Sequence, residues 1–514
     1  MTRFTSGARR AGLVVGAMAL VLSALPSASV AATGGGEGGG GDGPRWCPRV
    51  VGQRVDCGSL RRPLVVGEPE LGTIGVSYAV VRHRGQGPAR GTVAVNPGGP
   101  GEVAIDKAGE FAAGLAELLE DHDLLLVDPR GTGKSERMPC GVTDAEYRFG
   151  TRQEQRDAVA RCARTLGPRA QGYTTAATAD DIDAVRARLG VRQLTLYGLS
   201  YGTYLMPVYA SRHPESVRAV VLSGAYPHDF DPLVRPSAEA VSLALRRVCE
   251  RSVPKACDGD KAVRDLATTA ARLRERPLTV PIEAGGKTYR ERFTEGKLAN
   301  LMYEAASRGA GMEPDGASLL GSAPWALDRF VKGDTGPLRR LVREEGSSGS
   351  AEDQAPYIAV VCNDYRKAWA ADAPPSVRWQ QYRKALAGAG QGGFGAFSGQ
   401  GFTEGPTDGG DVCISWPREN TARPQPTDLA LPDVPVLVLS GDLDANTPDA
   451  NGRLAAGKFR HSTFFSVRNV GHVPELEPSG CVTGITSRFI RGGAPGDTSC
   501  LESLAPIAVT PVGR

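Results

Sequence analysis

The sequence predicts an α/β fold with a mostly parallel central sheet and a large, mainly helical insertion. Short apolar runs bounded by turn residues recur in the first half of the chain, as expected of buried strands: 73–81, 92–99, 123–131, 194–200 and 219–226. Helical patterns lie between some of these runs, which favours parallel strands joined by crossover helices. Strand-like runs then become scarce from about 227 to 429, where helical patterns dominate, and return in 434–444 and 462–473.

These changes of texture divide the chain into five parts. We expect a signal peptide over 1–31, a flexible glycine-rich linker over 32–45 and the first part of the sheet domain over 46–226. A helical cap insertion follows over 227–430, and 431–514 completes the sheet domain.

The N-terminus has the pattern of a secretory signal peptide. It starts with Arg3, Arg9 and Arg10, continues with an apolar run, and ends in the small residues Ser29-Val30-Ala31. A membrane anchor is the alternative, but the apolar run is too short to span a bilayer comfortably. We therefore expect a secreted, extracellular protein.

All ten cysteines follow the predicted signal peptide, and in an exported chain they are expected to form disulfides. Proximity along the chain suggests the pairs 47–57, 140–162, 249–257, 362–413 and 481–500. A metal site is the alternative, but the sequence has no C-x-x-C pair and no clustered histidines, so no metal is expected.

Without the predicted signal peptide the chain carries 57 basic and 57 acidic residues. This balance gives no reason to expect nucleic acid or an anionic membrane as a partner. We expect a peptide or small-molecule substrate and no cofactor.

The segment Gly131–Ser135, "GTGKS", resembles part of a phosphate-binding loop. That loop requires a glycine five residues before its G-K-[ST] end, where this chain has Asp128. It must also open a helix, and Pro139 and Gly141 would stop one almost at once. A nucleotide site is therefore not expected here.

The clearest helical pattern lies at 178–190. Thr178 and Asp181 fit a capping box, Ile182 begins an apolar stripe, and Gly190 ends the pattern. Asp181 and its acidic neighbours are then explained by the positive end of the helix dipole.

A serine nucleophile is indicated by Gly198-Leu199-Ser200-Tyr201-Gly202. The pattern G-x-S-x-G places its serine on a sharp turn between a strand and a helix, and both flank this motif. A serine needs a base, and His472 in "NVGHVPE" follows a late strand-like run. Asp444 follows another strand and can orient that histidine, with Asp442 as its close rival. The order serine, acid, histidine is that of an α/β-hydrolase.

An oxyanion hole is expected in "VAVNPGGPGE", the glycine-rich turn after the third predicted strand. Gly98 or Gly99 would donate a backbone N–H together with that of Tyr201. A plain Gly-Pro turn is the alternative.

The segments "NPGGPG", "DPRGTGKS", "GLSYGTYL", "SGDLDANTP" and "GHVPE" occur in this order and resemble the secreted tripeptidyl aminopeptidase family of α/β-hydrolases, relatives of proline iminopeptidase. The resemblance covers nearly all of the chain after the signal peptide. It implies Ser200 as nucleophile, Asp444 as orienting acid, His472 as base, and a structural role for Arg130. Glu102 and Met206-Pro207 depart from the family pattern.

The resemblance implies an exported serine exopeptidase that releases short peptides, tripeptides in that family, from free N-termini. An esterase, lactonase or amide hydrolase acting on a small secreted metabolite is the alternative, and a catalytically inactive binding protein is a third. A carboxylate would bind the substrate ammonium, and Glu102 and Asp364 are its candidates. Each also has a structural explanation: Glu102 would start a helix, and Asp364 would make a structural hydrogen bond.

Overall fold

The computed structural model describes residues 44–308, 318–347, 354–390, 392–405, 410–417 and 425–513, which belong to one compact unit. The predicted signal peptide and nearly all of the predicted linker lie outside these residues. No helix in the described ranges is both long and apolar enough to cross a membrane.

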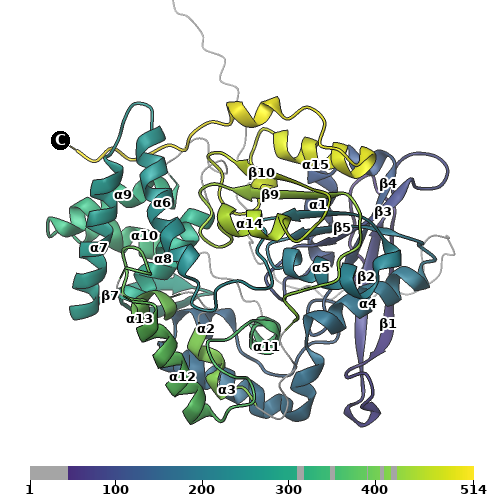
Figure 1. The fold of residues 1–514 in the computed structure, drawn as a ribbon, viewed down its shortest axis with the longest axis horizontal. Helices are drawn as coiled ribbons and strands as arrows, with labels where there is room; N and C mark the ends of the chain where they lie inside the picture. Colours follow the sequence, from purple (N-terminus) through teal and green to yellow (C-terminus); the bar gives the residue numbers. More distant parts are fainter. Residues whose placement is uncertain are drawn as a thin grey trace, which may run out of the picture. The chain divides into compact units, whose positions relative to one another are not determined.

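This unit contains an eight-stranded, mostly parallel sheet, which lies in the right half of Figure 1. Its spatial order is β1-β2-β4-β3-β5-β6-β9-β10. Only β2 runs antiparallel to its neighbours β1 and β4. The strands are β1 Val55–Pro63, β2 Thr73–Val81, β3 Gly91–Asn96, β4 His122–Val127, β5 Leu194–Leu199, β6 Val217–Ser223, β9 Val436–Gly441 and β10 Ser462–Val467. The prediction of a mostly parallel α/β sheet is confirmed.

Two apolar cores cover the two faces of the sheet, because alternate strand residues point to opposite sides. Val93 and Val95 of β3 pack in the core that contains α1 (Ala108–Gly114) and α15 (Cys481–Gly492). Ala94 packs in the core that contains α4 (Thr175–Arg188) and α5 (Gly202–Arg212). Burial on both faces explains why the inner strands are continuous apolar runs in the sequence.

A mainly helical region separates β6 from β9 in the chain (Figure 1). Its described helices are α6 Arg235–Arg251, α7 Gly259–Glu275, α8 Glu295–Ser307, α9 Leu319–Val331, α10 Gly336–Ser347, α11 Ala355–Asp364, α12 Pro375–Gly388 and α13 Gly399–Thr403. The remaining α-helices are α2 Asp144–Phe149, α3 Arg152–Leu166 and α14 Asp449–Ala456.

The helical region also contains a β-hairpin that the sequence analysis missed. Strands β7 (Leu278–Ala284) and β8 (Lys287–Phe293) are joined by Gly285 and Gly286, whose φ angles are 57° and 73°. A two-residue Gly-Gly loop with both φ angles positive is a strong hairpin signal, so the missed signal was present in the sequence.

The helix predicted at 178–190 begins earlier than expected. It is α4, and its N-cap is Thr174, whose side chain accepts a hydrogen bond from the N–H of Ala177. The predicted capping box of Thr178 and Asp181 is therefore wrong. Asp181 is instead the partner of the buried Arg130, whose Nε and Nη2 both donate to it at 2.8 Å. Arg130 also donates to the carbonyl of Leu64, in keeping with the structural role that the family resemblance implied.

All five disulfides suggested by proximity along the chain are formed: 47–57, 140–162, 249–257, 362–413 and 481–500. No cysteine is free. Disulfides persist in oxidising surroundings, so five of them indicate an extracellular or secreted protein.

Candidate active site

Ser200 lies on a sharp turn between strand β5 and helix α5. Its φ angle is 52°, a left-handed conformation that non-glycine residues rarely adopt. The turn is held by the N–H of Ser200, which donates to the carbonyl of Ser223 at 2.9 Å. Strain of this kind persists only where the surroundings impose it, and it is frequent at functional sites.

The glycines on either side of Ser200 are required by close backbone contacts. A Cβ on Gly198 would clash with the carbonyl group of Gly202. A Cβ on Gly202 would lie 2.7 Å from the carbonyl oxygen of Asn96. The G-x-S-x-G pattern therefore lets helix α5 start directly behind the serine, against the end of β3.

His472 and Asp444 lie side by side on the loops that follow β10 and β9. Nδ1 of His472 is 2.8 Å from Oδ2 of Asp444. Because an ionised carboxylate can only accept, Nδ1 carries the hydrogen and Nε2 is left as the basic nitrogen. Nε2 is buried and has no hydrogen-bond partner among the described residues, and His472 and Ser200 line the same cavity.

Asp444 is 2% exposed and is satisfied by further donors. The Thr447 hydroxyl donates to Oδ2 at 2.6 Å, and the N–H of Asn446 donates to Oδ1 at 2.7 Å. Burial acts to raise the pKa of Asp444, but the neighbouring His472 and the bond from Thr447 outweigh it and lower this pKa. Burial acts to lower the pKa of His472, but Asp444 raises it above the usual value.

Asp442, the rival acid, faces away from the histidine. It accepts a hydrogen bond from Nη2 of Arg251 at 2.7 Å and one from the N–H of Asn469 at 2.9 Å. The structure therefore brings Asp444, and not Asp442, against His472.

The predicted oxyanion-hole residues gather beside Ser200, but their amides differ in availability. The φ angle of Gly98 is 110°, and a Cβ there would lie 2.8 Å from that of Ser200. The N–H of Gly98 already donates to the side chain of Asn96 at 3.1 Å. No described group accepts a hydrogen bond from the N–H of Gly99 or Tyr201, so these two amides fit the role of donors better.

Among the described residues, two cavities that border Ser200 stand out. The larger, which we call the α1 cavity, has a volume of about 430 Å³ and also contains Gly99, Glu102, Lys107, Glu110, Phe111, Leu115, His472, Glu475 and Leu476. The smaller, the cap cavity, has a volume of about 50 Å³ and aromatic walls formed by Tyr226, Phe230, Tyr303 and Tyr365. His472 lines the first of these cavities, and Thr447, which is bonded to Asp444, lines the second.

Glu102 lies in the α1 cavity, as its position after the oxyanion glycines predicted. Its carboxylate is ion-paired with Lys107, a neighbour that the sequence analysis did not consider. The cavity therefore presents a paired carboxylate, and an incoming ammonium has to compete with Lys107 for it.

Asp364 does not line either cavity. It is fully buried, and its carboxylate accepts hydrogen bonds from both the N–H and the hydroxyl of Thr175. Of the two acids proposed for the substrate ammonium, only Glu102 is in a position to meet it, and Asp364 has the structural hydrogen bonds of the alternative interpretation.

Several residues around the site were missed by the sequence analysis. The carbonyl of Ser307 in α8 accepts a hydrogen bond from the backbone N–H of His472 at 2.6 Å, which ties His472 to the helical region. Glu475 is buried beside the α1 cavity and bonded to Tyr197. Thr447 stands in the quoted segment "SGDLDANTP", so its signal was available, whereas nothing in the sequence links Ser307 to His472.

Two family models match the parts of the chain that contain the site residues. Residues 91–258 match the model of the α/β-hydrolase fold, and residues 402–500 match that of the TAP-like proteins. The first range contains Gly99 and Ser200, and the second contains Asp444 and His472.

Three relatives illustrate the range of similarity. The chain is 34% identical over 194 residues to the serine protease Hip1 of Mycobacterium tuberculosis (strain ATCC 25618 / H37Rv), covering 34% of this chain and 37% of that protein. It is 23% identical over 499 residues to the tripeptidyl aminopeptidase of Streptomyces coelicolor, covering 88% and 84%. It is 28% identical over 482 residues to carboxylesterase B of M. tuberculosis (strain CDC 1551 / Oshkosh), covering 86% and 85%. The match to Hip1 thus spans well under half of that relative.

Proposed function

We propose that this chain, an α/β-hydrolase similar to the tripeptidyl aminopeptidases, is an exported serine exopeptidase that releases short peptides from free N-termini. The observation that carries the proposal is the buried Asp444–His472 pair: Nε2 of His472 has no hydrogen-bond partner among the described residues, and His472 lines the same cavity as the strained Ser200. The similarity to a tripeptidyl aminopeptidase over most of both chains supports the peptide substrate.

In the proposed reaction, Nε2 of His472 takes the proton of Ser200 as the serine oxygen attacks the substrate carbonyl. The backbone N–H groups of Gly99 and Tyr201 stabilise the resulting oxyanion. Asp444 keeps the hydrogen on Nδ1 and stabilises the charged imidazole. His472 then protonates the leaving amine. In the second half of the reaction His472 takes a proton from water, the water oxygen attacks the acyl-enzyme, and His472 returns the proton to the oxygen of Ser200.

Recognition of the free N-terminus is assigned in this proposal to Glu102. A carboxylate in a partly enclosed cavity favours a charged ammonium over a blocked amide, because the unpaired charge is costly to remove from water. Lys107 weakens this preference by competing for Glu102, so the pair sets the strength of amine selection.

A second candidate function is hydrolysis of an ester or amide of a small secreted metabolite. It is favoured by the similarity to carboxylesterase B and by the pairing of Glu102 with Lys107, which leaves no free negative charge on that carboxylate. The same three residues would carry out the chemistry, since a fold does not fix a substrate.

Both functions are tested by one screen of the purified protein. Aminoacyl, dipeptidyl, tripeptidyl and N-blocked chromogenic amides are compared with simple esters, with Ser200→Ala as the control. We expect free tripeptidyl amides to be the best substrates. Faster turnover of N-blocked than of free peptides would rule out the exopeptidase and leave the small-molecule hydrolase. Full activity of Ser200→Ala would rule out both.

A further inference from the structure

The carboxylate of Asp364 is connected to the nucleophile turn through two hydroxyl groups. Its Oδ2 accepts hydrogen bonds from the N–H and the hydroxyl of Thr175, at 2.5 and 2.6 Å. The same hydroxyl oxygen of Thr175 lies 2.7 Å from that of Tyr201. Both oxygens of this carboxylate accept from N–H donors, Oδ2 from Thr175 and Oδ1 from Nε2 of Gln425 at 3.2 Å, so the carboxylate acts as an acceptor. Thr175 therefore donates to Asp364 and accepts from Tyr201.

The backbone of Asp364 makes a second connection, to helix α5, which begins directly after Tyr201. Asp364 is the last residue of α11, where carbonyl groups lack partners within the helix. Its carbonyl oxygen accepts a hydrogen bond from the hydroxyl of Tyr204 at 3.0 Å. Tyr201 is the N-cap of α5 and Tyr204 lies in its first turn, so one residue of the helical region holds the start of the nucleophile helix at two points.

The geometry points to Asp364 as a positioning residue that, through Thr175, fixes Tyr201 and thereby aims its backbone N–H into the oxyanion hole. The inference rests on the proposed role of Ser200 and of the Tyr201 amide. It gives the helical region a part in the reaction itself, because α11 then belongs to the support of the oxyanion hole. Asp364 acts without touching the substrate.

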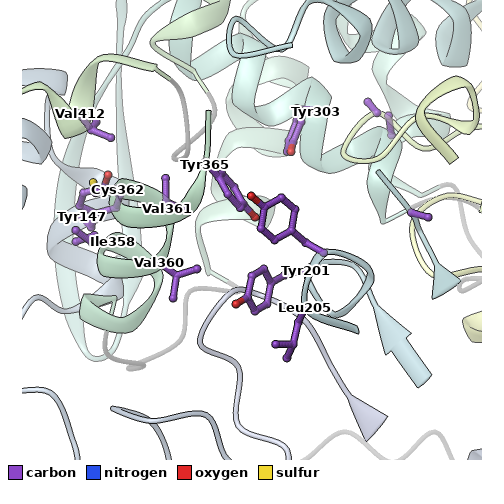
Figure 2. Packing of buried hydrophobic residues seen from close by; sticks show 14 of the residues in the cluster. Tyr147, Tyr201, Leu205, Tyr303, Ile358, Val360, Val361, Cys362, Tyr365 and Val412 are labelled. Carbon is purple, nitrogen blue, oxygen red and sulfur yellow. The ribbon is translucent and has the colours of Figure 1, made fainter. Parts of the chain in front are cut away.

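Tight packing around Tyr201 holds its ring in a fixed position. Figure 2 shows Tyr201 in a buried cluster with Leu205 of α5 and with Val360 and Val361 of α11. Tyr201 is 2% exposed, so no water replaces a lost hydrogen bond from its hydroxyl without rearrangement. A small shift of the ring is then transmitted to the backbone N–H of the same residue.

The test uses the full chain with p-nitrophenyl acetate as the probe, together with phenylboronic acid, which forms a tetrahedral adduct with a reactive serine. Tyr201→Phe and Thr175→Val each remove one hydroxyl and keep the shape of the side chain. We expect each to lower kcat about tenfold, less than the 10²–10³ for removal of an oxyanion donor, with KM changed less than twofold. Binding of phenylboronic acid should weaken by the same factor as kcat. The double variant should be no more than twofold worse than either single variant, because both act through one chain of bonds.

Asn363 provides the matched control, since it is buried at the same helix end and also bonds to the core. Its Nδ2 donates to the carbonyls of Ala170 and Tyr173, at 2.8 and 2.9 Å, away from Tyr201. Asn363→Ala should lower the melting temperature about as much as Asp364→Ala and leave kcat within twofold, whereas Asp364→Ala should lower kcat at least tenfold. Asp364→Asn keeps an acceptor for Thr175 and should restore most of kcat.

An unchanged kcat in Tyr201→Phe, or equal losses of kcat in Asn363→Ala and Asp364→Ala, would overturn the positioning role. Failure of the proposed function is seen separately, as ester hydrolysis that survives in Ser200→Ala. If the wild type cleaves the ester but no peptide, only the exopeptidase assignment fails, and the kcat comparison still decides the role of Asp364.

Discussion

Replacing Asp444 by asparagine is the sharpest test of the proposed mechanism, because the structure fixes how the new amide must turn. The side chain has two oxygen positions, one facing Nδ1 of His472 and the Thr447 hydroxyl, the other facing the N–H of Asn446 at 2.7 Å. An asparagine offers one oxygen and one NH₂ group. If the NH₂ group faces Asn446, two buried donors oppose each other, which costs about 1–3 kcal/mol.

The amide therefore turns its NH₂ group toward His472, and the histidine must accept with Nδ1. Its hydrogen then moves to Nε2, the nitrogen that has to take the proton of Ser200. This preference of about 1–3 kcal/mol alone lowers the population of His472 that carries its hydrogen on Nδ1 by about 5- to 150-fold, since 1.4 kcal/mol is a factor of ten. Loss of the negative charge beside the imidazolium adds to this, and a total fall in kcat of about 10³–10⁴ is expected.

The assay is steady-state hydrolysis of the best ester and amide from the substrate screen, with thermal unfolding to establish that the variant is folded. Asp442→Asn is the matched control, because its carboxylate bonds to Arg251 and to the backbone of Asn469 and does not contact His472. We expect its kcat to stay within about threefold of the wild type, because the bonds that it loses are made to Arg251 and Asn469 and not to His472. More than a few per cent of wild-type activity in folded Asp444→Asn, or a larger loss in Asp442→Asn, would refute the reasoning.

Three further predictions concern pH, the amine site and the disulfides. The pKa of His472 is raised above 6.5, and in the proposed mechanism the neutral ring is the base, so kcat/KM should rise with pH through a limb above 6.5. A limb below 6.5 in the pH profile would contradict this. Glu102→Gln should raise the KM for free-amine peptides about tenfold and change the KM for esters little, whereas Lys107→Gln should lower the KM for free-amine peptides. Equal effects on both substrate types would rule out an ammonium-binding role for Glu102. Replacing both Cys362 and Cys413 by serine opens the disulfide with the largest sequence separation, 51 residues. The free energy of unfolding, measured by urea denaturation, should fall by about 4 kcal/mol. A loss below about 1 kcal/mol would show that this crosslink does not restrain the unfolded chain.

The sequence alone determined the parts of the fold whose signal lies in neighbouring residues. Inner strands such as β5 are recognisable because both faces of a parallel sheet are buried, which produces continuous apolar runs. The edge strand β1 was missed because it is half-exposed and carries arginines, so it lacks that signature. Helix α4 was found but started at the wrong threonine, because Thr174 and Thr178 fit a cap equally well by residue type and only the backbone decides between them.

The sequence also determined which residue types were available for the chemistry and in what order. Ser200 and His472 were selected from chain order and from the strands that precede them, with Asp444 or its rival Asp442 as the acid, and neighbouring cysteines were enough to suggest the disulfides. Which of two nearby acids meets the histidine was left open in the residue pattern, because it depends on how the loop after β9 turns. Only the tertiary structure placed Asp444 beside His472 and turned Asp442 toward Arg251.

Only the tertiary structure decided the partners of charged groups that are distant in sequence. Glu102 and Asp364 had the same standing in the sequence as acids near the site, yet one lies in the α1 cavity beside Lys107 and the other is buried against Thr175. Asp181 looked like a helix-dipole residue and is the partner of Arg130. The physical reason is common to these cases: a residue's type and spacing fix what it can bond to, whereas burial and the packing of distant segments fix what it does bond to.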